Sequence, residues 1–241
     1  MANLRIVLVE PREAGNVGAV ARVMKNFGFD DLWIVGDHPQ LLPVAGWWAS
    51  GADDLLEGAH LAETLQEALA DTHLTVATTS MRGRTTPADF TPPQLGAELS
   101  SLAVDQTLAL VFGREDSGLT RDELALCQRS AFIPTTENFP TMNLAQAAGV
   151  FCFSLSAIDR AGGSRKLAPA ALVERLHERF EALLLEVGFL HANNPARIYE
   201  EFRAILGRAG LDERETTILL GMLRQIEWKV GGGWGGMKGE G

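Results

Sequence analysis

The sequence has few of the residues that build metal sites or disulfide frameworks. Only two of its 241 residues are cysteines and five are histidines. The cysteines are isolated, and neither Cys-x-x-Cys nor His-x-x-x-His spacing occurs, so we expect no metal and no disulfide. A Walker phosphate loop and a Gly-x-Ser-x-Gly nucleophile elbow are also missing. These absences favour a protein of a reducing compartment, the cytoplasm.

Long hydrophobic runs are missing too. The longest stretch without a charge, residues 138–158, includes proline, asparagine, glutamine and serine. It therefore predicts a buried helix and not a membrane span. The N-terminus enters an apolar strand directly, without the charged and hydrophobic regions of a secretory leader. We expect no contact with a membrane.

The net charge of −10 argues at first against nucleic acid, whose phosphates favour a basic surface. Its distribution weakens that argument. Residues 30–71 hold nine acidic residues and no lysine or arginine, whereas residues 1–29 hold four basic and two acidic residues. We expect the acidic block to lie away from the functional site, and RNA to bind elsewhere with a shallow salt dependence.

Short apolar runs alternate with helical patterns over the first 160 residues. We predict strands at residues 5–10, 32–35, 74–78, 107–112 and 131–133. We predict a loop over Pro11–Gly18 and helices at 17–27, within 53–60 or 61–70, from a capping box at Thr120 to about 128, and at 143–159. This alternation predicts an α/β domain with a largely parallel sheet.

The remaining third of the chain has a different pattern. Residues 161–169 are small, polar and basic, which predicts a linker after a first domain at 1–160. Apolar stripes at helical spacing follow at residues 170–187, 196–206 and 216–228, the last after a second capping box. We predict a small all-α extension over 170–230 and a disordered glycine-rich tail over 231–241.

Three segments follow predicted strands, at the edge where open α/β sheets bind ligands. They contain N-x-G-x-x-A-R-x-x-x-N-F-G from Asn16, L-V-F-G-R-E-x-x-G-L from Leu110, and I-P followed by M-N-L-A-Q-A from Ile133. The first segment, with Asp37 after the next strand, also suggests a dinucleotide fingerprint. Gly15 lies six residues past Val9, however, which is too far for the turn that approaches a pyrophosphate.

The three segments together resemble the SpoU family of RNA 2′-O-methyltransferases, of the SPOUT class. The start R-I-V-L-V-E-P, the segment T-T-S-M-R-G-R at 78–84 and the helical extension are most similar to its TrmJ subgroup. The resemblance implies a parallel sheet with helices on both faces and a C-terminal trefoil knot. It also implies a homodimer that binds S-adenosyl-L-methionine (SAM) in the knot loops.

The resemblance assigns a cofactor site as well. Gly113 would allow a close backbone approach, the Ile133 backbone would bond adenine, and Asn143 would brace the knot. Thr141 stands in Pro-Thr-Met-Asn, where relatives commonly have Ser-Leu-Asn, so its side chain has no assigned role. The implied cofactor residues are Thr79, Ser80, Met81, Gly113, Ile133, Pro140, Thr141, Met142, Asn143 and Leu144.

The implied catalytic residues are Arg22, Asn16 and Glu115. Because arginine stays protonated in nearly every setting, we expect Arg22 to hold the target phosphate and stabilise charge on the attacking oxygen. Asn16 would position Arg22 or the ribose, and Glu115 would hold its loop or the Arg22 of a neighbouring subunit. The residues expected to contact RNA are Arg12, Arg82, Arg84 and Arg114.

The hypothesis is methyl transfer from SAM to a ribose 2′-hydroxyl, at the pyrimidine of position 32 in the tRNA anticodon loop. Ribosomal RNA is an alternative substrate. Two other classes stay open, a nicotinamide-dependent oxidoreductase and a non-catalytic RNA-binding dimer. The pair Trp47-Trp48 has two interpretations, base stacking and packing within the core or a dimer interface.

Overall fold

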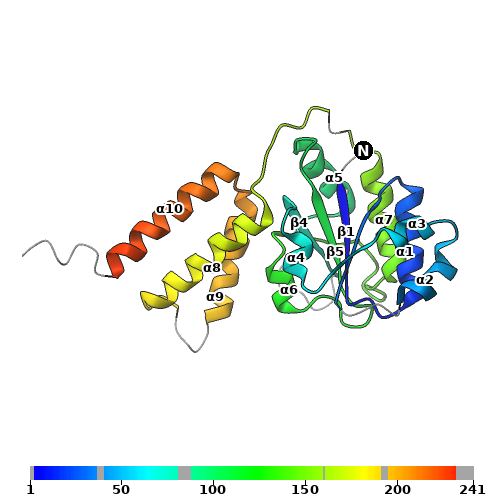
Figure 1. The fold of residues 1–241 in the computed structure, drawn as a ribbon, viewed down its shortest axis with the longest axis horizontal. Helices are drawn as coiled ribbons and strands as arrows, with labels where there is room; N and C mark the ends of the chain where they lie inside the picture. Colours follow the sequence, from blue (N-terminus) through cyan, green and yellow to red (C-terminus); the bar gives the residue numbers. More distant parts are fainter. Residues whose placement is uncertain (1–2, 37–40, 81–87, 160, 191–194, 232–241) are drawn as a thin grey trace, which may run out of the picture. The chain divides into compact units, whose positions relative to one another are not determined.

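The computed structural model describes residues 3–36, 41–80, 88–159, 161–190 and 195–231. Contacts divide the chain into two compact units, Met1–Lys166 and Leu167–Gly241, and each is described by itself. The first unit contains a sheet with helices, and the described part of the second is helical (Figure 1). The boundary between the units falls inside the predicted linker at 161–169.

Apolar runs form the strands of the first unit. Within the described residues they join in one parallel six-stranded sheet of order β3-β2-β1-β5-β4-β6. Both central strands, β1 and β5, are buried along their whole length, as expected for a sheet covered on two faces. The carboxyl ends of all strands share one edge. The strands are β1 (Leu4–Val9), β2 (Asp31–Val35), β3 (His60–Ala62), β4 (Leu74–Thr78), β5 (Leu108–Phe112) and β6 (Arg129–Ala131).

Helices cover both faces of this sheet. In Figure 1, α1 and α7 lie on one side of it and α4 and α6 on the other. α1 packs against α7 and α2, and α5 packs against α7. These helices are α1 (Ala14–Asn26), α2 (Leu41–Ala49), α3 (Asp53–Glu57), α4 (Leu65–Leu69), α5 (Pro92–Ser101), α6 (Arg121–Ala125) and α7 (Leu144–Ser156). The predicted α/β fold is confirmed, and the trefoil knot stays a prediction.

The loop predicted over Pro11–Gly18 is wrong, because α1 already begins at Ala14. The cause lies far along the chain. The Glu115 carboxylate accepts hydrogen bonds from the backbone N–H groups of Arg12 and Glu13, at 3.0 and 3.2 Å. It thereby satisfies donors that a helix start leaves free. Gly15, Asn16 and Gly18 are therefore helical.

Other differences concern short elements. The single helix predicted within 53–60 or 61–70 is replaced by α3, β3 and α4, and neither α2 nor α5 was predicted. The strand predicted at 131–133 lies two residues earlier, and α6 ends at Ala125 rather than near 128. The capping box at Thr120 is confirmed: its hydroxyl accepts from the Glu123 N–H, and the Glu123 carboxylate accepts from the Thr120 N–H.

The described part of the second unit consists of α8 (Ala170–Glu186), α9 (Pro195–Ala209) and α10 (Glu213–Val230). Leu176, Leu183 and Leu223 form its buried centre, and the inner face of α10 packs against α8 there. The predicted helices and the second capping box, at Asp212, are confirmed. The predicted disordered tail lies outside the described residues, apart from Gly231.

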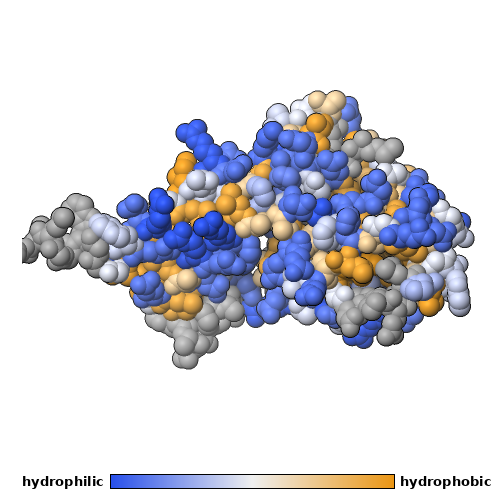
Figure 2. All heavy atoms as spheres, viewed as in Figure 1, coloured by the Kyte–Doolittle hydropathy of each residue, from blue (hydrophilic) through white to orange (hydrophobic). Residues whose placement is uncertain are grey.

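Neither a membrane-spanning helix nor a metal site is found in the part of the chain that the structure describes. No described helix combines the length and hydropathy that a bilayer crossing requires. No group of three or more His, Cys, Asp or Glu side chains is placed there to hold a metal ion. Figure 2 shows patches of hydrophobic surface among polar ones on both units.

Candidate functional site

A cavity of about 360 Å³ opens at the carboxyl edge of the sheet. Three segments that are distant in sequence form its walls, and each follows a strand: β4, β5 or β6. Apolar side chains from β5, α6 and α7 complete it. The lining residues are Thr78, Thr79, Ser80, Phe112, Gly113, Arg114, Glu115, Asp116, Ser117, Gly118, Leu119, Leu124, Ile133, Thr135, Pro140, Thr141, Met142, Leu144, Ala147 and Phe151.

The structure brings most of the predicted cofactor residues together in this cavity. Among them, Thr79, Ser80, Gly113, Ile133, Pro140, Thr141, Met142 and Leu144 all line it. Met81 lies outside the described residues. Asn143 is not a lining residue. Instead it caps α7, where its side-chain oxygen accepts from the N–H groups of Ala145 and Gln146 at 2.9 and 3.3 Å.

Gly113 begins a tight loop between β5 and α6. The N–H groups of Arg114 and Gly118 donate to each other's carbonyls at 3.2 and 2.9 Å, which closes the loop. A Cβ on Gly113 would lie 2.2 Å from the Gly118 carbonyl carbon, and Gly118 has a φ of +70°. A glycine is thus required at position 113 because the backbone there lies close to the backbone of Gly118, on the other side of the same loop.

Asn16 joins all three motifs through its side chain. Its amide donates to Glu115 Oε1 at 2.9 Å, and its oxygen accepts from the Asn143 amide at 2.8 Å. Both hydrogen-bonding ends of the Asn16 side chain are therefore engaged inside the chain. This geometry suits a residue that positions the loop of Glu115 against α7, and leaves the ribose contact predicted for Asn16 without support.

Glu115 lies where these hydrogen bonds converge. Burial favours a higher pKa for Glu115, but the hydrogen bonds from Asn16, Arg12 and Glu13 outweigh it and hold the pKa below its ordinary value. The carboxylate also lies at the N-terminus of α1, where the helix dipole favours negative charge. Glu115 therefore stabilises the start of α1 in its ionised form.

We predict that Glu115→Gln lowers the free energy of unfolding at pH 7 by about 1–2 kcal/mol, because an amide nitrogen then faces backbone donors. The folded-state pKa of Glu115 is depressed, so its stabilisation is full above the unfolded pKa. It is lost as the pH falls through the folded pKa. Chemical denaturation of both proteins should show a difference that shrinks below pH 4.5. Asp116→Asn, on the same loop, is the control, and an equal loss there would contradict the prediction.

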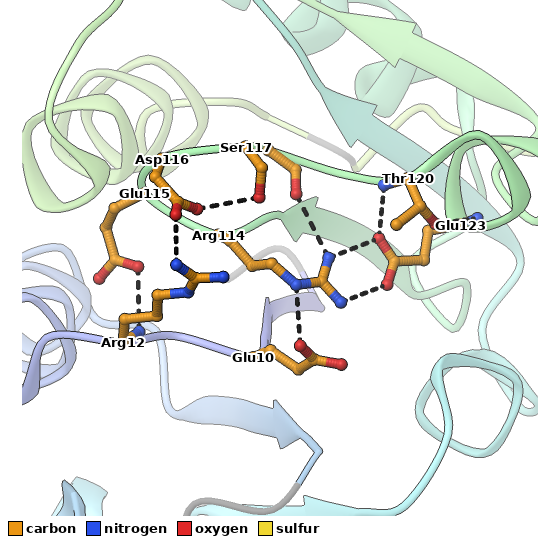
Figure 3. A network of polar contacts seen from close by, with 9 residues as sticks. Glu10, Arg12, Arg114, Glu115, Asp116, Ser117, Thr120 and Glu123 are labelled. Carbon is orange, nitrogen blue, oxygen red and sulfur yellow. Dashed lines mark hydrogen bonds and ion pairs between the residues drawn. The ribbon is translucent and has the colours of Figure 1, made fainter.

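Arg114, a predicted RNA contact, is held inside the protein (Figure 3). Its guanidinium donates to Glu10 at 2.8 Å and to both carboxylate oxygens of Glu123 at 3.0 Å, and its side chain is only 10% exposed. Glu10, at the end of β1, has the unusual φ of +43°. The pair of carboxylates thus ties three segments together through Arg114. We assign Arg114 a positioning role and do not propose it as an RNA contact.

The other predicted arginines occupy different environments. Arg12 forms an exposed ion pair with Asp116 at the rim (Figure 3). Arg82 and Arg84 lie outside the described residues. Arg22 is exposed on α1 and is not among the described residues that line the cavity. The site of one chain therefore lacks the residue predicted to handle the phosphate and the 2′-oxygen.

The acidic block lies closer to this site than predicted. α2 and α3, which belong to it, pack on α1, and Asp54 forms an ion pair with Lys25 at 2.5 Å. At the opposite edge of the sheet, Asp31 and Asp71 bind the buried Arg5 at 2.9 and 2.6 Å. Part of the acidic block is therefore paired with basic side chains of β1 and α1, and is not simply a solvated surface.

Several residues of the site were not found from the sequence. Glu10 was assigned to a strand and Glu123 to a capping box, and nothing local indicated that both would bind Arg114. The apolar wall formed by Phe112 and Phe151 was assigned only to core. The order and spacing of the motifs were the signal available, because they placed three glycine-bearing segments after predicted strands, at the same sheet edge.

The parallel sheet, the cavity at its carboxyl edge and the three joined motifs define an α/β domain of the SPOUT class. The chain belongs to the SpoU rRNA Methylase family, whose profile matches residues 3–153. The profile of the TrmJ C-terminal domain matches residues 171–233. The predicted family and subgroup are thus confirmed over both units.

Individual relatives agree with this family. The tRNA (cytidine/uridine-2′-O-)-methyltransferase TrmJ of Klebsiella pneumoniae is 38% identical, over 94% of this chain and 97% of its own. The crystal structure of TrmJ from Z. mobilis ZM4 is similar with a TM-score of 0.81 and 31% identity, over 94% of this chain and 100% of its own. The SpoU methyltransferase AviRb of Streptomyces viridochromogenes, solved with AdoMet, is 18% identical over 65% and 60% of the two chains. It shares the fold, with a TM-score of 0.50.

Proposed function

We propose that this protein is a SAM-dependent tRNA methyltransferase that acts on a ribose 2′-hydroxyl, at the pyrimidine of position 32 in the anticodon loop. The observation that supports it most is the cavity, which is walled by the second and third motifs and by the segment after β4. Asn16, in the first motif, braces it through its hydrogen bonds to Glu115 and Asn143. The activity for which the TrmJ relatives are named supports the choice of tRNA and of a pyrimidine. We place this activity in the cytoplasm.

The residues of the cavity fit SAM in size and chemistry. A volume of about 360 Å³ falls in the range of roughly 300–1,000 Å³ for small-molecule sites. Thr79, Ser80 and the 140–142 segment contribute polar groups to the lining, while Phe112 and Phe151 supply apolar surface. Ile133 also lines the cavity, and we assign its main-chain groups to the adenine ring. We propose that these residues hold the cofactor.

SAM, when bound, supplies a methyl group on a positively charged sulfur. The chain must then align the 2′-hydroxyl with that methyl and remove its proton as the new O–C bond forms. We assign Arg22 to the target phosphate, where its guanidinium stabilises the negative charge that develops on the 2′-oxygen. The proton leaves to the phosphate or to water. Glu115 and Asn16 hold the loop between β5 and α6 in position against α1.

We propose that the enzyme acts as a homodimer in which Arg22 of a second copy completes each site. Two observations support this. Arg22 is exposed and does not line the cavity of its own chain. An apolar surface lies on α7 and at the C-cap of α1, where Phe153 is 68% exposed and meets Phe27 edge to face at 6.0 Å. A second copy seated there would cover this surface.

The test is transfer of a tritiated methyl group from SAM to unmodified tRNA transcripts, followed by mapping of the labelled nucleotide. We expect label at the 2′-oxygen of position 32, and none when that ribose is replaced by 2′-deoxyribose. Ribosomal RNA is assayed in parallel, because the matched family is named for it. Label in ribosomal RNA alone would identify ribosomal RNA, and not tRNA, as the substrate. No label in any RNA would favour a non-catalytic RNA-binding dimer.

The nicotinamide alternative loses its structural basis. Gly15 and Gly18 lie within α1 and face α2, so no glycine loop between β1 and α1 is left for a pyrophosphate. Asp37 lies outside the described residues. A thermal shift assay separates the two classes: SAM and S-adenosylhomocysteine should raise the unfolding midpoint, and NAD should not.

A further inference from the structure

Helix α2 presents a small aromatic surface. Trp47 is 83% exposed, Trp48 is 59% exposed and the neighbouring Val44 is 40% exposed. Packing of the two tryptophans in the core of the single chain is therefore wrong, whereas packing at a dimer interface, the other part of that interpretation, stays a prediction. Exposure of an indole ring to water is unfavourable in free energy. Two adjacent exposed rings therefore indicate a binding surface.

The aromatic surface formed by Trp47 and Trp48 is held against α1 at two glycines. A Cβ on Gly18 would lie 2.1 Å from the Ala45 carbonyl oxygen, so the backbones of α1 and α2 touch there. The indole of Trp48 lies over Gly15, 3.4 Å from the position a Cβ would occupy. Gly15 and Gly18 thus allow α2 to pack closely against α1, the helix that carries the first motif. A preformed aromatic surface loses little conformational freedom when a ligand stacks on it.

The contact between α2 and α1 lies beside the proposed site. Gly15, Gly18 and Arg22 are spaced by three and four residues, so they share the face of α1 on which α2 rests. Asn16, which holds Glu115 and Asn143, directly follows Gly15. Trp48 therefore lies between the braced start of α1 and the arginine assigned to the target phosphate. A nucleotide that flanks the target would pass over this surface.

The charge around α2 suits a base and not a phosphate. Residues 38–52 contain no lysine, arginine, aspartate or glutamate, which leaves α2 as the uncharged part of the acidic segment. In α3, the carboxylate of Asp54 is paired with Lys25. Bases in a single-stranded loop are unstacked, and aromatic side chains bind their faces without reading sequence.

The size of the surface also favours a base over a second copy of the chain. An aromatic side chain buries about 150–250 Å² when it is fully covered. Two indoles and one valine therefore fall short of the roughly 800 Å² per partner in a stable protein interface. They match the area of one or two stacked bases.

We propose that Trp47 and Trp48 form a stacking platform for an anticodon-loop base next to the methylated nucleotide. The proposal rests on the proposed function, because it takes the substrate to be the single-stranded loop of a tRNA. The platform would raise affinity for the loop. It adds an RNA contact that does not depend on basic side chains, in a protein whose net charge is −10.

The experiment measures binding of a fluorescein-labelled, unmodified anticodon stem-loop by anisotropy, together with its methylation. We expect Trp47→Ala/Trp48→Ala to weaken binding roughly tenfold to hundredfold and to raise KM in step. At saturating RNA, kcat should stay within about twofold, and SAM affinity should not change. Trp47→Phe/Trp48→Phe should restore most of the binding, since a phenyl ring also stacks.

Further measurements separate the possible failures. Trp47→Ala alone removes a side chain that is 83% exposed, so it tests the platform without risk to folding. Val104→Ala is the control, because Val104 is also exposed, at 60%, and precedes β5, away from the platform. If the wild-type protein neither binds nor methylates the stem-loop, the proposed function fails. If it does both and the alanine variants do so equally well, the platform is overturned. Dissociation of a dimer in the alanine variants, seen by sedimentation, would assign the two indoles to a protein interface instead.

Discussion

Replacing Arg22 with alanine should abolish measurable methyl transfer, a loss of roughly a thousandfold or more, while SAM binds as tightly as before. The guanidinium is a fixed positive charge that is never deprotonated in ordinary settings, so its work is electrostatic. Removal of one such group from a site of developing negative charge typically costs about 10²–10³ in kcat. Loss of the phosphate contact adds to it. Because Arg22 does not line the cofactor cavity, SAM affinity has no reason to change.

The measurement is single-turnover methylation of unmodified tRNA with SAM affinity determined by calorimetry. Lys25→Ala is the matched control, because Lys25 lies one turn further along α1 and is paired with Asp54. It should retain nearly full activity. Arg22→Lys should recover only part of the rate, since lysine cannot grip a phosphate with two parallel donors. Equal loss of SAM binding in Arg22→Ala would contradict the assigned role.

The central strands were predictable because their environment is uniform. Val7 and Leu8 in β1, and Leu110 and Val111 in β5, are fully buried between two layers of helices, so their runs are continuously apolar. β3 has three residues at the sheet edge, two of them exposed, and gives no such signal. α2 could not be predicted either. Its nine residues include proline and glycine, and its outer face carries tryptophan where a surface helix normally carries charge.

Motif spacing predicted which residues meet, but not what each one does there. Gly18 could have been a turn residue from its sequence context, and only the backbone of Ala45 shows that it is a contact point between helices. Arg114, within the second motif, was predicted to contact RNA. Its burial between Glu10 and Glu123 depends on partners 104 and 9 residues away, which no local pattern encodes. The role of a residue whose partners are distant in sequence can be assigned only from the structure.

Replacing Gly113 with alanine should weaken SAM binding by about tenfold or more and lower the stability of the first unit. The added Cβ would lie 2.2 Å from the carbonyl carbon of Gly118 and 2.4 Å from the Leu119 nitrogen, both backbone atoms that cannot move alone. The loop must open, and overpacking of this kind costs about 1–3 kcal/mol. Because the loop forms one wall of the cavity, the wall moves with it.

Calorimetry with SAM and thermal unfolding check this prediction, with Gly162→Ala as the control, since a Cβ on Gly162 would meet nothing within 4 Å. Unchanged SAM affinity in Gly113→Ala would show that the cofactor binds elsewhere. At a SAM concentration too low to occupy the Gly113→Ala cavity, each variant alone is inactive, and the two together test the dimer. Co-expressed Arg22→Ala and Gly113→Ala chains regain activity if Arg22 acts across the interface, because one mixed site has an intact cavity and an intact arginine. If Arg22 acts within its own chain, every site lacks one of the two and the mixture stays inactive.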